Sequence, residues 1–170
     1  MKKSDLLIFE ISKVEIVIIF LYYFLLLILG GVFSIKILCE LNEELTQKQF
    51  IIKTVVSSLS VSGMLCSLQY IKRLYKACIT NRIVPISTFA GHIGNLAYFI
   101  LRPFFAFAFV IVMIYAILSG MFIVTGSLDY IINEKFLYLC VMLSSFVGYS
   151  VGQVLDKFEN ISKEKINKLE

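Results

Sequence analysis

Hydroxyl and amide side chains gather in one apolar stretch, residues 54–71, and they are the groups there that could do chemistry. Thr54, Ser58, Ser62 and Gln69 share one face at helical spacing. Such groups can hydrogen-bond to water or to a permeating solute, so this face is a candidate pore lining. Ser and Thr can also bond to their own helix backbone, which makes them tolerable in a buried central helix. The sequence leaves both interpretations open.

Small residues that could bring helices into close contact fall into two sets. Small residues one helical turn apart let helix backbones approach closely, which drives association where lipid supplies no hydrophobic force. The packing acts either within one bundle or between subunits. The set on a second face of residues 54–71 is Ser60, Gly63 and Ser67. The set in the last apolar stretch, spaced by four, is Cys140, Ser144, Gly148 and Gly152.

Arg102 and Pro103 stand at the start of the third apolar stretch. Proline fits the first turn of a helix, because its missing N–H would be unpaired there anyway. An arginine just outside that turn is typical of a residue that contacts lipid headgroups. We therefore predict that Arg102 and Pro103 form an interfacial anchor. In the alternative, Arg102 faces a vestibule and selects anions, or pairs with Glu15 or Asp156.

Catalytic and metal chemistry find little support in the sequence. His92 is the single histidine, and the four cysteines form no Cys-x-x-Cys pair. Residues 54–71, 103–126 and 136–155 contain no Asp, Glu, His, Lys or Arg, which proton relays and intramembrane enzymes use. We predict no catalytic residue, no cofactor, no metal and no enzymatic activity. Nucleic-acid binding is also not expected, since no basic stripe is interleaved with aromatic residues.

Four apolar stretches must position these residues. They cover residues 15–35, 54–71, 103–125 and 136–155, and a helix needs roughly 20 such residues to cross a bilayer. The chain is 59% hydrophobic and 16% charged. Helices are expected, because lipid offers no partner for unpaired backbone groups. The sequence predicts an all-α integral membrane four-helix bundle. Thr46 and Gln49 make a capping box that starts the second helix early and extends it through Tyr75.

Two further segments flank the spans. Residues 80–101 are predicted to form a cytoplasmic amphipathic segment, with Ile86, Phe89, Ile93, Leu96 and Ile100 on its apolar face. The segment lacks the many lysines of a surface-seeking peptide, so in the alternative it is a helix packed against neighbouring spans. Residues 156–170 are predicted to form a charged cytoplasmic tail. Basic residues are concentrated in the N-terminal segment, in the loop after residue 71 and in this tail. Basic loops stay cytoplasmic, so both termini are predicted to be cytoplasmic.

A short motif carries a resemblance to a known group of proteins. Leu101-Arg102-Pro103 opens an Ala- and Phe-rich stretch that closes on Tyr115 to Gly120, and Phe146, Gly148 and Ser150 follow near the end of the next stretch. Over residues 101–155 the chain resembles small bacterial multi-span membrane proteins that act as phage-defence effectors. The resemblance implies an oligomer that permeabilises the inner membrane. It transfers no binding residue to this sequence.

Two hypotheses for function follow. In the first, the chain forms a homo-oligomeric inner-membrane pore, with residues 54–71 lining it and residues 136–155 making the subunit contact. In the second, it is a non-conducting accessory subunit or anchor. In both, a cytoplasmic protein partner or signal would act at residues 72–102 or at the tail. The hypotheses differ at the Thr54, Ser58, Ser62 and Gln69 face, which is wet in a pore and buried against another helix in an anchor.

Overall fold

The computed structural model describes residues 9–10, 13–40, 46–79, 83–84, 89–125 and 134–166. Its helices are α1 (Lys13–Cys39), α2 (Gln47–Ile79), α3 (Phe89–Thr125) and α4 (Glu134–Ile166). The other described element is a two-residue parallel pairing of β1 (Phe9–Glu10) with β2 (Ile83–Val84). Each of the four helices contains a stretch long and apolar enough to cross a membrane. The predicted all-helical architecture with four candidate spans is therefore confirmed.

The outer surface of the bundle is apolar along these stretches. Leu25 of α1 is 58% exposed, Val112 of α3 is 65% exposed and Phe146 of α4 is 62% exposed, and many other large apolar side chains are exposed beside them. A continuous apolar surface of this kind drives aggregation in water but is compatible with lipid. The exposed surface therefore supports the assignment of these helices as membrane spans.

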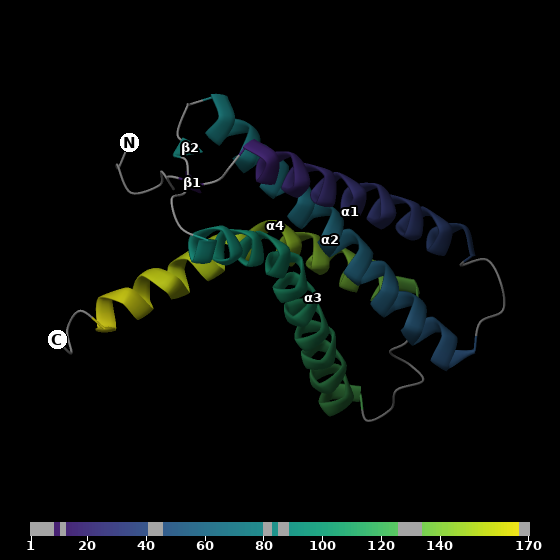
Figure 1. Cartoon of the computed structure of the whole chain (residues 1–170). Coiled ribbons are helices and arrows are strands. Elements are labelled where there is room, and N and C mark those ends of the chain that lie inside the picture. Colours follow the sequence, from purple (N-terminus) through teal and green to yellow (C-terminus); the bar gives the residue numbers. More distant parts are fainter. Residues whose placement is uncertain are drawn as a thin grey trace.

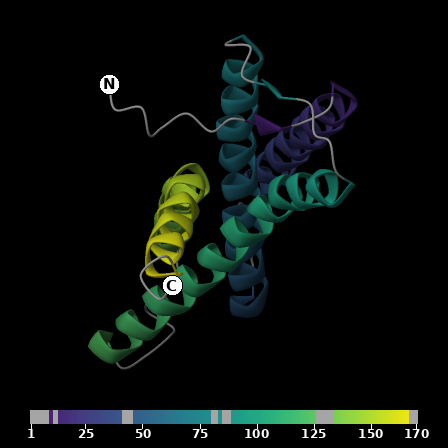
Figure 2. The same ribbon diagram turned by 60° about the vertical axis from the view of Figure 1, so that its left-hand side comes forward.

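Helix α2 is the central element of the bundle. It contacts each of the other three helices, and Figure 2 shows it running between α1 and α4. The backbone N–H of Thr46 donates to Oε1 of Gln49 at 3.1 Å, and the N–H of Phe50 donates to the carbonyl of Thr46 at 3.0 Å. The first bond satisfies an N–H that the first turn would otherwise leave unpaired, and the second is the first i to i−4 bond of the helix. The half of the predicted capping box that Gln49 supplies and the long second helix are both confirmed.

Helices α1 and α2 form an antiparallel pair that is tight at one glycine. A Cβ on Gly30 would lie 2.7 Å from the backbone oxygen of Ser60, so a larger residue there would force the helices apart. At one end of the pair, Nζ of Lys53 lies 3.5 Å from the carboxylate of Glu40 and donates to its backbone carbonyl at 3.0 Å. The pair is thus fixed by close backbone contact and by polar contacts at its end.

Helices α2 and α4 run parallel to each other. A Cβ on Gly148 would lie 2.8 Å from the Cα of Ser62, and a Cβ on Gly152 would lie 2.6 Å from the hydroxyl of Tyr70. The contact positions increase together along both helices, which defines the direction. With α1 antiparallel to α2, the first residues of α1 lie at the same end of the bundle as the last residues of α2.

Helix α3 differs from the sequence-based expectation. We predicted a separate amphipathic segment over residues 80–101, with a membrane helix starting at Pro103. In the structure, one helix begins at Phe89 and continues through Pro103. It bends near its middle (Figure 1), as prolines inside helices cause. Of the predicted apolar face, Ile93 and Ile100 are exposed. Residues 80–82 and 85–88 of that prediction lie outside the described residues.

Helix α4 also extends beyond its predicted boundary. It continues through Ile166, so residues 156–166 of the predicted tail continue the same helix. The remaining tail residues, 167–170, lie outside the described part of the chain.

The neighbouring glycines of α1 provide a matched test of this packing. Gly30→Ala should lower the free energy of unfolding by about 1–3 kcal/mol, because its new methyl group meets the backbone of Ser60. Gly31→Ala should be neutral or slightly stabilising, since nothing lies within 4 Å of its Cβ position. Unfolding by SDS titration in mixed micelles measures both variants. Equal effects at the two positions would contradict the α1–α2 contact.

Candidate functional site

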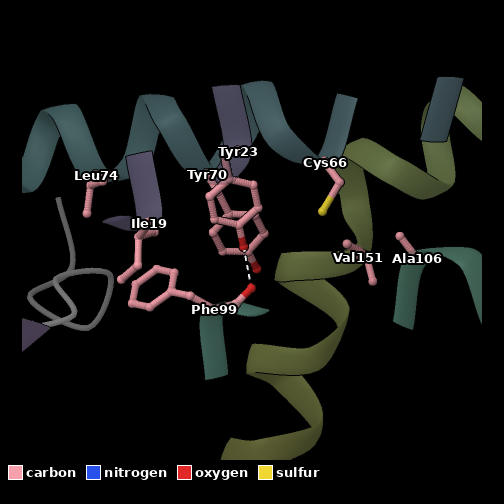
Figure 3. Packing of buried hydrophobic residues seen from close by; sticks show 8 residues of the cluster. All are labelled: Ile19, Tyr23, Cys66, Tyr70, Leu74, Phe99, Ala106 and Val151. Carbon is pink, nitrogen blue, oxygen red and sulfur yellow. Dashed lines mark hydrogen bonds between the residues drawn. The ribbon is translucent and has the colours of Figure 1, made fainter. Parts of the chain in front are cut away.

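Pro103 leaves one backbone carbonyl of α3 without its helical donor, and another helix has to supply a donor. Proline has no backbone N–H, so the carbonyl of Phe99, four residues earlier, loses its normal helical donor. The hydroxyl of Tyr23, on α1, donates to that carbonyl at 2.6 Å (Figure 3). Tyr23 is fully buried. At membrane depth, neighbouring helices must satisfy backbone groups that a proline frees, and here α1 supplies the donor.

The rings around this bond join three helices. The ring of Tyr23 stacks on that of Tyr70, on α2, with 5.3 Å between centroids and an interplanar angle of 11°. The ring of Phe99 meets Tyr70 edge-on at 6.2 Å. Aromatic pairs in these geometries stabilise by roughly 0.5–1.5 kcal/mol beyond the area they bury. The hydroxyl of Tyr23 is therefore held in place by a stacked ring as well as by its hydrogen bond.

Arg102 precedes the break and lies inside the bundle. Its side chain is 3% exposed, and Nη1 donates to the carbonyl of Gly152, on α4, at 3.2 Å. The guanidinium carbon lies 3.9 Å from the ring centroid of Tyr98 and 5.7 Å from that of Tyr70. Burying a charge is costly unless such partners compensate for lost hydration. Arg102 thus connects α3 to α4 and to α2.

These positions correct the interfacial-anchor prediction. We expected Arg102 outside the helix, facing headgroups, and Pro103 in the first turn. The prediction of Pro103 in the first turn is wrong, because the proline lies in the helix interior. The buried side chain of Arg102 faces neighbouring helices rather than the outside of the bundle.

The proposed pore-lining face of α2 is buried within the bundle. Thr54, Ser58 and Ser62 are fully buried and Gln69 is 6% exposed. The hydroxyl of Thr54 donates to the carbonyl of Phe50 at 2.9 Å. Within the described part of the chain, Oγ of Ser58, Oγ of Ser62 and Oε1 of Gln69 have no hydrogen-bond partner. In this conformation the face is sealed, so the bundle offers no polar path along it.

The small residues of α2 meet two neighbouring helices. The backbone oxygen of Ser60 lies against Gly30 of α1, and Gly63 faces Phe107 of α3 at 3.0 Å from its Cβ position. The buried hydroxyl of Ser67 donates to the carbonyl of Gly63 at 2.7 Å. Each small residue therefore either admits a neighbouring helix or satisfies its own polar group.

The small residues of α4 meet α2 of the same chain. Ser144 is fully buried, and its hydroxyl donates to the carbonyl of Cys140 at 2.6 Å. Gly148 lies against Ser62, and Gly152 lies against Tyr70. Of the two interpretations left open by the sequence, these contacts correspond to packing within one bundle.

Pro103, Arg102, Tyr23 and Tyr70, with the carbonyls that accept from them, form a junction of the four helices. Among the described residues, no group of three His, Cys, Asp or Glu side chains could hold a metal ion. The junction contains a proline break, a buried cation, hydrogen bonds that join α1 to α3 and α3 to α4, and a ring stack that adds α2. A displacement of one of these helices therefore changes the contacts of the others.

Sequence reasoning did not identify Tyr23, Tyr70 or the carbonyl of Phe99. A signal was present, because a tyrosine buried in an apolar helix needs a partner for its hydroxyl. A proline inside an apolar stretch likewise leaves one carbonyl needing a donor. What the sequence lacks is the pairing between them.

By its helices and its apolar outer surface, the chain has the character of a multi-pass membrane protein. No family model, curated protein or solved structure matches it. The resemblance to phage-defence effectors therefore stays a prediction that depends on the Arg102-Pro103 and Phe146 to Ser150 motifs.

The orphaned hydroxyl of Ser62 gives a test of the sealed face. Ser62→Ala should leave stability unchanged or raise it by up to about 1 kcal/mol, because it removes an unsatisfied buried group. Ser144→Ala should lower it by roughly 0.5 kcal/mol, since it removes a hydroxyl that is hydrogen-bonded. SDS titration of the two variants gives the comparison. A larger loss for Ser62→Ala would mean that its hydroxyl has a stabilising partner.

Proposed function

We propose that the chain is an oligomeric, membrane-permeabilising protein of the bacterial inner membrane, and that the conformation described here is closed. The observation that carries the proposal is the sealed polar face of α2. Oγ of Ser58, Oγ of Ser62 and Oε1 of Gln69 are buried there without partners. Separation of α4 from α2 would expose them to water and open a polar path.

The energetics of this face favour a closed state that can be opened. Leaving a buried polar group unsatisfied costs about 1–3 kcal/mol. Close packing of Ser62 on Gly148 offsets that cost while the seam between α2 and α4 stays shut. Entry of water between α2 and α4 would remove the cost of the unsatisfied polar groups, but it would also remove the close packing. The two terms oppose each other, so a modest input of free energy could shift the balance.

The exposed basic residues indicate the side of the membrane from which this free energy is supplied and the residues at which it acts. Lys72 and Lys76 of α2 and Lys157 of α4 are exposed near the last residues of their helices. By the positive-inside rule, this end faces the cytoplasm, and both termini lie there. A signal or a cytoplasmic protein partner would act at residues 72–102 or at the tail. The resemblance to phage-defence effectors suggests antiviral defence as the setting.

A second candidate function is a non-conducting membrane module that recruits a cytoplasmic partner. The burial of the Thr54, Ser58, Ser62 and Gln69 face favours it, since an anchor needs no wet surface. The two candidates share the closed structure. They differ in whether the seam ever opens.

Flux through reconstituted liposomes, measured with the mass of the detergent-solubilised protein, decides between them. We expect an oligomer whose transient opening, without any added signal, releases an entrapped ion or dye. The triple variant Ser58→Ala, Ser62→Ala, Gln69→Leu should lower flux at least about tenfold, because a dry apolar path blocks permeation. Ser60→Ala is the matched control, since its hydroxyl bonds to its own helix at Val56 and it lies off this face.

Ser62→Leu is a poorer probe, because the Cα of Ser62 lies against Gly148 and a leucine there would disturb packing itself. A strict monomer without flux would overturn the permeabilising function and leave the non-conducting module. Flux that survives the triple variant would show that this face does not line the path.

A further inference from the structure

We infer that the hydroxyl of Tyr23 replaces the N–H that Pro103 lacks, and that with Arg102 it forms a latch that keeps α4 on α2. The latch is defined by the side chains of Tyr23 and Arg102 and by the carbonyls of Phe99 and Gly152 that accept from them. The donor assignment stands on geometry alone, whereas the latch rests on the proposed opening of the seam.

The assignment of Tyr23 follows from the position of its acceptor. The hydrogen-bond pattern of an α-helix joins the N–H of residue 103 to the carbonyl of Phe99, and that is the carbonyl to which Tyr23 donates at 2.6 Å. In Figure 3 the hydroxyl of Tyr23 points straight at this carbonyl. Packing of the ring alone does not require the hydroxyl of Tyr23 to contact the one carbonyl that the proline leaves without its helical donor.

The adjacent Tyr22 provides a contrast within the same helix turn. Its hydroxyl donates to the carbonyl of Ile100 at 3.3 Å, at the exposed edge of the contact. The helical donor to Ile100 is the N–H of Phe104, which proline does not remove. The bond from Tyr22 is therefore supplementary, whereas the bond from Tyr23 replaces one that the helix cannot form.

Arg102 connects the latch to the interface between α2 and α4. This residue directly precedes the break, and its guanidinium donates to Gly152, the residue of α4 that lies against Tyr70 of α2. Tyr70 in turn stacks on Tyr23. A movement of α3 at the break would therefore draw Arg102 away from Gly152 at the point where α4 meets α2. Loss of the Tyr23 bond removes the donor that replaces the missing N–H and makes that movement easier.

A double-mutant cycle tests the donor assignment without reference to flux. Tyr23→Phe keeps the ring and removes the hydroxyl, and it should raise the unfolding equilibrium constant about tenfold. In the Pro103→Ala background, where residue 103 again carries an N–H, the same change should raise it less than about twofold. Tyr22→Phe is the matched control and should stay below about twofold in both backgrounds. SDS titration in mixed micelles measures all the variants.

Liposome flux then tests the latch. Tyr23→Phe should release entrapped dye at least about threefold faster than the unsubstituted chain, and Tyr22→Phe should not. Equal effects of Tyr23→Phe with and without Pro103 would overturn the donor assignment. Unchanged release by Tyr23→Phe, where the unsubstituted chain conducts, would overturn the latch while leaving the proposed function in place. Absence of flux from every variant would overturn the proposed function, and the cycle would still decide the donor assignment.

Discussion

The missing N–H of Pro103 is the constraint on which the arrangement of the four helices depends. A carbonyl that loses its helical donor in water can accept a hydrogen bond from solvent. A carbonyl that loses it at membrane depth needs a donor from the protein. The carbonyl of Phe99 finds it in Tyr23, which fixes α1 against α3. Stacking of Tyr23 on Tyr70 then fixes α2 at the same level. Arg102, one residue before the proline, adds α4 through Gly152. One backbone defect thus accounts for a junction of all four helices.

The sealed face of α2 depends on the same junction. Small residues let α4 approach α2 so closely that a methyl group on Gly148 would meet the backbone of Ser62. The polar side chains of the face are buried, although two hydroxyls and one amide oxygen there are left without partners. Tight packing and unsatisfied polar groups oppose each other at one interface. Under the proposed function, this interface has a closed and an open arrangement, and the position of α4 selects between them.

The sequence predicted the features that local rules determine. Four apolar stretches identified the helices, Thr46 and Gln49 identified the start of α2, and the serines identified a polar face on α2. Features that depend on distant partners were not predictable. Tyr23 lies 76 residues from Phe99, and Arg102 lies 50 residues from Gly152. No spacing rule connects such pairs.

Pro103 shows why a correct local rule gave a wrong position. Proline is favoured in the first turn and costs about 3 kcal/mol inside a helix of a soluble protein, so the sequence favoured a helix start. The structure instead keeps the proline inside α3, because Tyr23 compensates for part of that cost. For the polar face, the periodicity showed which residues lie together. It did not show whether water or α4 faces them, since that depends on how the helices are arranged.

Thiol accessibility at position 58 tests most directly whether the α2 face is sealed by α4. The Ser58→Cys variant, with the four native cysteines replaced, would be treated in intact liposomes with a charged thiol reagent that cannot cross lipid. We expect a very slow reaction, because residue 58 is fully buried, and a clearly faster one when Tyr23→Phe is added. Rapid reaction in the Ser58→Cys variant alone would contradict the sealed face. Equal, slow rates with and without Tyr23→Phe would contradict its control by the break in α3.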